Sequence, residues 1–216
     1  MINPVKTYCA TDKKDVPEIL DVVEVSAKKG LYVAGFVSYE AASSFDQSLK
    51  HQELHDMPLA WFTEFRTIRP FELSENDDAI DLHPVTEGEN FISSVIRIKN
   101  FLESGDVYQV NLTQKLHGEP ENSATDIFSK LVRTQPSPYA MLLESDDFSI
   151  CSASPELFFS KRGKLIEMQP MKGTRERGRF NEEDKKNKED LKSSEKDRAE
   201  NLMILDMVRN DLGKIC

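Results

Sequence analysis

The feature that most constrains the fold is a strand-turn-strand pattern in the second half of the chain. Residues 151–154 and 157–160 are rich in strand-forming side chains, and residues 164–168 alternate apolar and polar positions. Residues 161–163 end in glycine and form a tight turn, and Pro170 closes the last strand because proline donates no ladder hydrogen bond. The pattern therefore predicts a β-hairpin, and with it an antiparallel sheet.

Two charged residues flank this hairpin. Glu156 stands before its first long strand and Lys172 follows its last, so the turn can bring both to one end of a sheet. An amine and a carboxyl group placed together can serve as a nucleophile and its acid. The alternative is a solvated surface ion pair, which is the commoner arrangement for Glu and Lys on a hairpin.

Residues 196–216 predict one long helix. Ser193 or Ser194 can cap its start, Asp197 completes a capping box with Ser194, and Gly213 predicts its end. The centre of the helix is apolar nearly all round, at residues 202–205, 207 and 208. A helix of this kind is expected to be buried.

Polar and charged residues flank or interrupt this apolar centre, namely Glu200, Asp206, Arg209, Asn210 and Asp211. Charges near a buried surface need a partner, a metal ion or water, because leaving them unpaired is costly. Glu200 is therefore a candidate functional residue. The alternative is that Glu200 faces solvent and pairs with Lys196 one turn earlier.

The rest of the chain mixes helices and strands that are segregated rather than strictly alternating, which predicts an α+β protein. Residues 68–88 carry two prolines and an acidic cluster, so they form the expected connection between an N-terminal portion and the rest. Residues 175–192, crowded with charges of both signs, are expected to be a mobile, exposed connector. Further strands are expected at residues 31–39, 58–65, 107–115 and 139–144, and helices at residues 91–102, closed by Gly105, and 124–133.

Composition excludes several classes of function. The 216 residues include 28 Lys and Arg against 38 Asp and Glu, and the net charge of −10 disfavours nucleic acid or an anionic membrane as a partner. The three cysteines are unclustered, which indicates neither a disulfide framework nor a zinc site. The chain has no signal-peptide pattern and no apolar run of about 18 residues, so a cytoplasmic protein is expected.

His51 and His55 stand one helical turn apart and could share a face as metal ligands. The zinc-protease pattern needs a glutamate directly after the first histidine, where this chain has Gln52, so an ordinary surface pair is expected. No glycine-rich phosphate loop occurs in the sequence, which removes nucleotide binding as an interpretation.

Three segments occur in an order that resembles one enzyme family. They are SGDVYQVNL, then SASPELFFS with PMKGTRERG, then KDRAENLMILDMVRNDLG. Together they resemble the chorismate-binding enzymes, which include anthranilate synthase component I, aminodeoxychorismate synthase component I, isochorismate synthase and salicylate synthase. The resemblance covers the chain from about Phe91 to its end. The pieces GFVSYEAASSFD and PLAWF also resemble the short form of aminodeoxychorismate synthase component I.

The resemblance implies a fold and a domain division. The family fold packs large antiparallel sheets together with helices outside. Residues 1–88 would be the N-terminal portion of a short-type component I, and residues 89–216 the first half of the catalytic domain. Because family members continue for roughly another such length, the resemblance implies a truncated product that is inactive alone.

Lys172 distinguishes members within the family, since anthranilate and isochorismate synthases typically carry alanine at this motif position. The resemblance therefore implies formation of 4-amino-4-deoxychorismate, the precursor of 4-aminobenzoate and folate. A neutral lysine would add to the chorismate ring with loss of the 4-hydroxyl, and ammonia would then displace the lysine. Burial or a neighbouring cation would favour the neutral amine by lowering its pKa. Glu156 matches the acidic residue of the family's Ser-Pro-Glu motif and would protonate the departing hydroxyl.

The resemblance also implies a metal site and substrate contacts. Glu200 matches the family glutamate that binds Mg²⁺, a hard cation suited to one or two carboxylates. Gly173 and Thr174 would donate hydrogen bonds near the substrate. Gln109 occupies about the position where isochorismate synthases carry a lysine base, which favours ammonia over water as the nucleophile.

The partners implied are chorismate and a glutamine amidotransferase subunit that delivers ammonia. The cysteines of this chain lack the nucleophile-elbow context of a glutaminase. Two alternatives stay open. One is anthranilate synthase component I, and the other is a non-catalytic module that binds a partner without chorismate.

Overall fold

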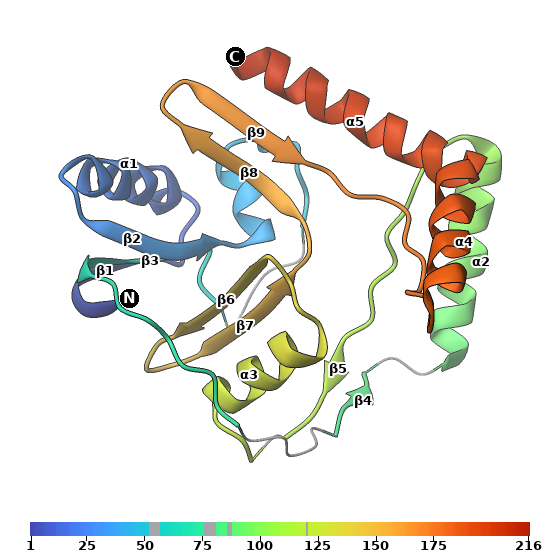
Figure 1. Ribbon diagram of the computed structural model, residues 1–216. Coiled ribbons are helices and arrows are strands. Elements are labelled where there is room, and N and C mark those ends of the chain that lie inside the picture. Colours follow the sequence, from blue (N-terminus) through green and yellow to red (C-terminus); the bar gives the residue numbers. More distant parts are fainter. Residues whose placement is uncertain (52–56, 76–80, 86–87, 120) are drawn as a thin grey trace. The chain divides into compact units, whose positions relative to one another are not determined.

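A computed structural model describes residues 1–51, 57–75, 81–85, 88–119 and 121–216. The protein has an α+β fold, in which helices accompany antiparallel sheets (Figure 1). The chain divides into two compact units, Met1–Leu73 and Ser74–Cys216. The division falls inside the connection that the sequence predicts at residues 68–88, ahead of the expected boundary at its end.

The first unit is a three-stranded antiparallel sheet with one long helix. Its elements are β1 (Ile2–Ala10), α1 (Asp15–Lys28), β2 (Tyr32–Val37), a 3₁₀-helix η1 (Tyr39–Ser44) and β3 (Ala60–Thr67). The strand order is β1-β3-β2, so Ala60 of the central strand stands opposite both Ala10 and Val37. The sequence predicted β2 and β3, whereas β1 and α1 were missed.

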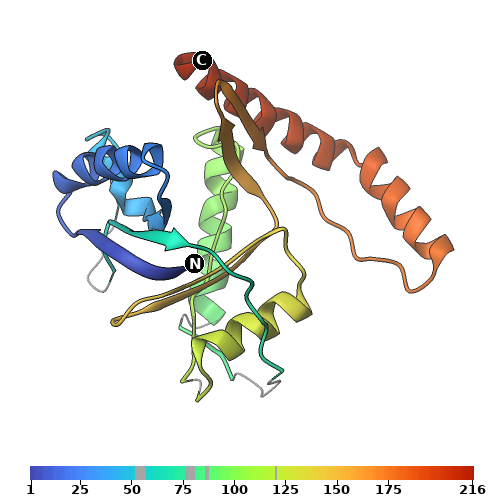
Figure 2. The ribbon, with the colours of Figure 1, turned by 60° about the vertical axis from the view of Figure 1, so that its left-hand side comes forward.

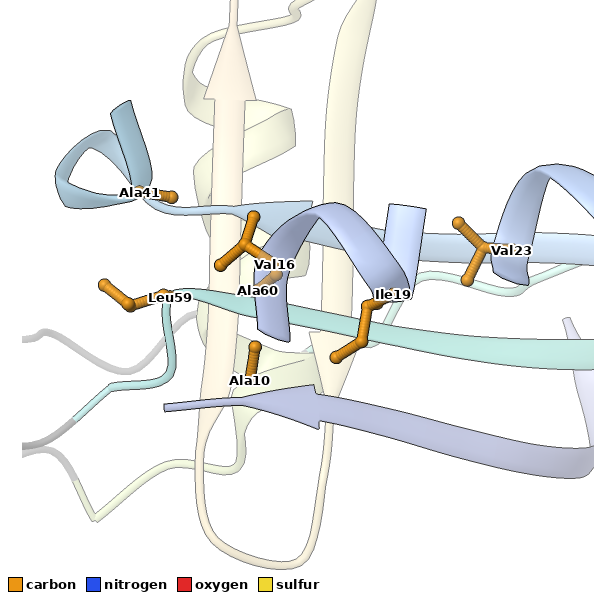
Figure 3. Packing of buried hydrophobic residues seen from close by; sticks show 7 residues of the cluster. All are labelled: Ala10, Val16, Ile19, Val23, Ala41, Leu59 and Ala60. Atoms are coloured by element: carbon orange, nitrogen blue, oxygen red, sulfur yellow. The ribbon is translucent and has the colours of Figure 1, made fainter. Parts of the chain in front are cut away.

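The core of this unit lies between α1 and the sheet (Figure 3). Val16, Ile19 and Val23 recur at helical spacing on α1 and are buried, and burying one such side chain contributes roughly 1.5–3 kcal/mol. The sheet and its flanks contribute Ala10, Ala41, Leu59 and Ala60 to the same cluster.

A buried carboxylate also joins α1 to the sheet. Glu64 of β3 is 5% exposed and accepts hydrogen bonds from the Ser26 hydroxyl on α1 and from the Tyr8 hydroxyl on β1, the latter at 2.7 Å. The hydrogen bond from Ser26, and then that from Tyr8, lowers the pKa of Glu64 because both stabilise the charged form. The hydrogen bond to Glu64 in turn raises the pKa of Tyr8.

The second unit carries short antiparallel pairs. Among the described residues, the strands pair as β4 with β5, β6 with β7, and β8 with β9. The strands are β4 (His83–Pro84), β5 (Leu116–His117), β6 (Tyr139–Glu144), β7 (Ser149–Ser154), β8 (Leu157–Arg162) and β9 (Leu165–Gln169). The helices are α2 (Gly88–Ser104), α3 (Ala124–Thr134), α4 (Asn181–Ser193) and α5 (Glu195–Ile215).

Helix α3 packs against the β6-β7 hairpin. Phe128 and Ser129 of α3 and Leu143 of β6 are buried, and the Cys151 thiol of β7 donates to the Ala124 carbonyl at 3.4 Å. Burial, and then the nearby Glu144, raises the pKa of Cys151. A partly buried thiol that donates to a backbone carbonyl is typical of a structural cysteine.

The predicted β8-β9 hairpin is confirmed, as are α2, α3, β6 and the start of α5. Gly105 ends α2 with a positive φ of 80°, as its position predicts. The backbone N–H of Asp197 donates to the Ser194 hydroxyl at 3.3 Å, which confirms Ser194 as the cap of α5.

Three predictions in this unit were wrong. Residues 107–115 form no strand among the described residues, because an alternating pattern also needs a neighbouring strand for its backbone groups. Residues 175–192 include α4, which shows no apolar periodicity but carries acids in its first turn and Lys192 in its last. Helix α5 continues through Gly213, since one interior glycine costs only about 1 kcal/mol.

The expected burial of α5 is also wrong for the described structure. Leu202 and Met207 are 65% and 62% exposed, and the helix has no buried residue. The sequence shows that α5 has apolar residues on several sides. These residues are buried only where another element of structure packs against them. Within the described part of the chain, every helix is too short or too polar to span a membrane.

Candidate functional site

Three residues from distant parts of the second unit meet around one carboxylate. Glu200 on α5 lies with its Oε1 atom 3.8 Å from the Lys172 Nζ atom and accepts a 2.8 Å hydrogen bond from the Gln109 side-chain amide. The 3.8 Å separation is an ionic contact rather than a hydrogen bond. The Lys172 and Glu200 side chains are 21% and 29% exposed, so the pair is partly screened from water but reachable.

The three residues of this site come from three different parts of the fold. Lys172 follows β9, Glu200 lies in the second turn of α5, and Gln109 belongs to the irregular segment after α2. The expected strand around Gln109 is absent, yet its side chain still reaches Glu200. The alternative pairing of Glu200 with Lys196 is replaced by contacts with Lys172 and Gln109.

Glu156 lies at the open end of the β8-β9 hairpin, where Leu157 pairs with Gln169. Its carboxylate accepts a 3.0 Å hydrogen bond from the backbone N–H of Met171, the residue before Lys172. Its own N–H donates to the Ser154 hydroxyl at 3.3 Å. The hairpin thus fixes the Glu156 carboxylate to the backbone next to Lys172, while the ionic contact of Lys172 goes to Glu200.

Gly173 allows the chain to pass close to α5. Its φ is +75°, a conformation that side chains rarely adopt, and a Cβ there would lie 3.1 Å from both the Asp197 Cβ and the Leu191 Cδ1. Thr174 is exposed, and its carbonyl accepts a 2.8 Å hydrogen bond from Arg175. The structure thus places both residues beside Lys172, and their contacts with substrate remain a prediction.

The connection after Gly173 is held by alternating arginines. Arg175 pairs with Asp197 of α5 at 2.8 Å, and Arg177 donates to both oxygens of Asp184 at 2.6 and 2.9 Å. Arg179 pairs with Glu183 at 3.2 Å. Figure 2 shows this segment leaving β9, running in extended form and turning back into α4, which leads into α5. These ion pairs attach the predicted connector to α4 and α5, its exposure is confirmed, and its mobility stays a prediction.

The hydrogen bonds of this segment lower the pKa values of its acidic partners. Hydrogen bonds from Arg177, and then from the Gly178 backbone, lower the pKa of Asp184 to about 2. Hydrogen bonds from Arg179 lower the pKa of Glu183. Hydrogen bonding to Ser194, and then to Arg175, lowers the pKa of Asp197. Sequence reasoning missed these pairs, although the every-other-residue spacing of the arginines was a usable signal.

A metal ion would find a sparse donor set here. Among the described residues, no three acidic, histidine or cysteine side chains cluster closely enough to hold a metal ion together. Glu200 supplies one carboxylate, which suffices only for an ion that takes its other ligands from substrate and water. His51 shares a 2.8 Å hydrogen bond with the Ser43 hydroxyl, and His55 lies outside the described residues.

Comparison with known proteins identifies the family of the chain. Residues 68–216 match the model of a family described as chorismate binding enzyme. The chain is 39% identical over 170 residues to aminodeoxychorismate synthase component 1 of Bacillus subtilis, covering 79% of this chain and 36% of that protein. It is 31% identical over 186 residues to anthranilate synthase component 1 of Acetivibrio thermocellus, covering 86% and 37% respectively.

A solved structure shares the fold. The crystal structure of anthranilate synthase component I from Streptococcus pneumoniae TIGR4 superposes with a TM-score of 0.70 at 23% identity, covering 86% of this chain and 50% of that chain. The chain therefore spans half of the solved protein and little more than a third of the two curated relatives. Because the family model matches most of its length, the chain belongs to the chorismate-binding enzyme family.

Proposed function

We propose that the protein to which this chain belongs is aminodeoxychorismate synthase component I, which converts chorismate and ammonia to 4-amino-4-deoxychorismate for 4-aminobenzoate and folate synthesis. The observation that carries the proposal is the position of Lys172, partly sheltered and in ionic contact with Glu200. Once its contact with Glu200 is released, a neutral amine at this place can serve as a nucleophile toward a substrate bound beside Glu200. The similarity to the Bacillus subtilis protein of that name supports the same assignment.

The proposed reaction uses Lys172 and Glu156 in turn. The neutral Lys172 amine forms a C–N bond to the chorismate ring, and the 4-hydroxyl leaves as water after Glu156 donates a proton. Ammonia then forms a C–N bond to the ring, the Lys172 amine leaves, and the ammonium formed on the product returns a proton to Glu156. The net reaction exchanges a hydroxyl for an amino group and releases one water, so Lys172 is regenerated.

The other site residues would bind rather than react. Gln109 donates to Glu200 and so holds this carboxylate in place. Gly173 and Thr174 would present donors to the substrate, since both adjoin Lys172. Mg²⁺ is proposed as the cofactor, with Glu200 as its ligand from this chain, and it would neutralise a chorismate carboxylate. The Lys172 ammonium and the metal would compete for Glu200, so binding of the ion is expected to release the lysine.

Ammonia is proposed to come from a glutamine amidotransferase subunit in the cytoplasm. The net charge of −10 gives no support for nucleic acid or membrane partners. Anthranilate synthase component I is the second candidate, favoured by the names of several relatives. A non-catalytic interaction module is the third, and it predicts that Glu156→Gln and Lys172→Ala change nothing.

Product analysis by mass spectrometry tests the proposal. The protein as its gene encodes it is incubated with chorismate, Mg²⁺ and ammonium, and Lys172→Ala is compared with Lys164→Ala, an exposed lysine in the β8-β9 turn. The expected product is 4-amino-4-deoxychorismate, lost in Lys172→Ala and retained in Lys164→Ala. Formation of anthranilate, or full activity of Lys172→Ala, would overturn the assignment.

A further inference from the structure

Two ionic contacts join the connection after β9 to α5 in matching register. Lys172 meets Glu200, and three residues later Arg175 meets Asp197. Asp197 and Glu200 are themselves three residues apart, so they lie on one face of the helix. The connection therefore runs antiparallel to α5 across two contacts, of which Arg175 with Asp197 is the shorter at 2.8 Å against 3.8 Å.

Asp197 is the better-anchored acid of the two. Its side chain is 16% exposed, and its backbone N–H donates to the Ser194 hydroxyl that caps α5. A Cβ on Gly173 would lie 3.1 Å from the Asp197 Cβ, so the connection passes directly over this residue. Asp197 thus contacts the chain on the C-terminal side of Lys172, at both Gly173 and Arg175.

We propose that Asp197 is a positioning residue, which acts through Arg175 to hold Lys172 beside Glu200. The inference rests on the proposed function, because it assigns Asp197 a role at the same site. Lys172 is a long, flexible side chain on a segment without regular structure, so its location depends on where the following backbone is fixed. A displacement of about 1 Å at a reacting group can cost up to a hundredfold in rate.

A matched control separates positioning from general stability. Asp184 anchors the same connection through a bidentate contact with Arg177, yet it lies on α4, and Arg177 is further from Lys172 along the chain than Arg175 is. Asp184→Asn therefore weakens one attachment of the connection but leaves its two ionic contacts with α5 unchanged. Asp197→Asn keeps side-chain size and removes the charge that Arg175 meets.

The first test observes Lys172 directly in the 216-residue chain. Lysines are reductively methylated with ¹³C, which retains their charge, and the Lys172 signal is identified by its loss in Lys172→Arg. In Asp197→Asn the signal is expected to move to the position of exposed lysines, whereas in Asp184→Asn it stays in place. An unmoved Lys172 signal in Asp197→Asn would overturn the inference, as would an equal shift in both variants.

The second test uses the protein as its gene encodes it, with chorismate, Mg²⁺ and ammonium. Asp197→Asn is expected to lower kcat roughly tenfold to a hundredfold with little change in KM, and Asp197→Glu to restore most of the loss. Glutamate keeps the charge and suits this capping position. A loss in Asp184→Asn as large as that in Asp197→Asn would overturn the inference. Absence of any aminated product from the wild type would refute the proposed function, while the methyl-lysine signals would still decide the role of Asp197.

Discussion

Ser26 on α1 and Glu64 on β3 are joined by a buried hydrogen bond that links the helix to the central strand of the first unit. Removing the Ser26 hydroxyl leaves the buried Glu64 carboxylate with the hydrogen bond from Tyr8 but without the one from Ser26, and losing a hydrogen bond to a charged group typically costs about 1.5–3 kcal/mol. We therefore expect Ser26→Ala to lower the free energy of unfolding by about this amount in urea denaturation. Val25→Ala, at an exposed neighbouring position on α1, is the control. Equal stability of the two variants would contradict the prediction.

Stability should depend on pH through the same carboxylate. The pKa of Glu64 is lower in the folded protein than in the unfolded chain, so the unfolded state binds more protons in the acid range. Its contribution is therefore present above the unfolded pKa of about 4.3 and is lost as pH falls through the folded pKa. Unfolding free energies measured from about pH 6 downward should decline less steeply in Glu64→Gln. A steeper decline in that variant would show that the sign is wrong.

Gly173 combines a left-handed backbone with a crowded position, whereas Gly163 has φ of +61° and open space around it. Both alanine variants should lose about 1 to 2 kcal/mol from the backbone conformation. Gly173→Ala should lose more, because its Cβ also crowds Asp197 and Leu191. Thermal and chemical denaturation of the two variants measures the difference, and an identical loss would place Gly173 in open surroundings.

The low pKa of Asp184 has a spectroscopic consequence. The Gly178 backbone N–H donates to this carboxylate at 2.9 Å, so its amide proton should report the protonation of Asp184. We expect the Gly178 amide shift to titrate with a midpoint of about 2 and to lose this transition in Asp184→Asn. Arg177→Lys, which gives up the bidentate contact, should raise the midpoint. A midpoint unchanged by Arg177→Lys would remove Arg177 as the cause.

Local signals in the sequence predicted the elements whose determinants are themselves local. The β8-β9 hairpin follows from its turn at Gly163, and the start of α5 follows from Ser194 and Asp197. Helix α4 was missed because it is held by end charges and by contacts of Arg177 and Arg179 with its acids. Contacts between charged side chains produce no apolar periodicity, which is the main signal by which a helix is predicted from sequence.

The sequence motifs predicted the residues of the candidate site but only part of its geometry. Lys172, Glu200 and Gln109 lie together although they come from separate segments, and the roles that the resemblance gives them stay predictions. Glu156 contacts the backbone of Met171, a detail that a sequence pattern cannot contain because it depends on how the hairpin ends. Asp197 looked like a capping residue, and its second contact, with Arg175, depends on tertiary structure.

The arginines of the anchored connection stand at every second residue, which matches the alternation of side chains along an extended chain. Inserting or deleting a single residue among them would turn the following arginines to the opposite side, away from their acids. Length is consequently more constrained than composition in this segment. The stretch between β9 and α4 has no helix or strand, yet it acts as a spacer. Its number of residues sets how far Lys172 lies from α4 and α5.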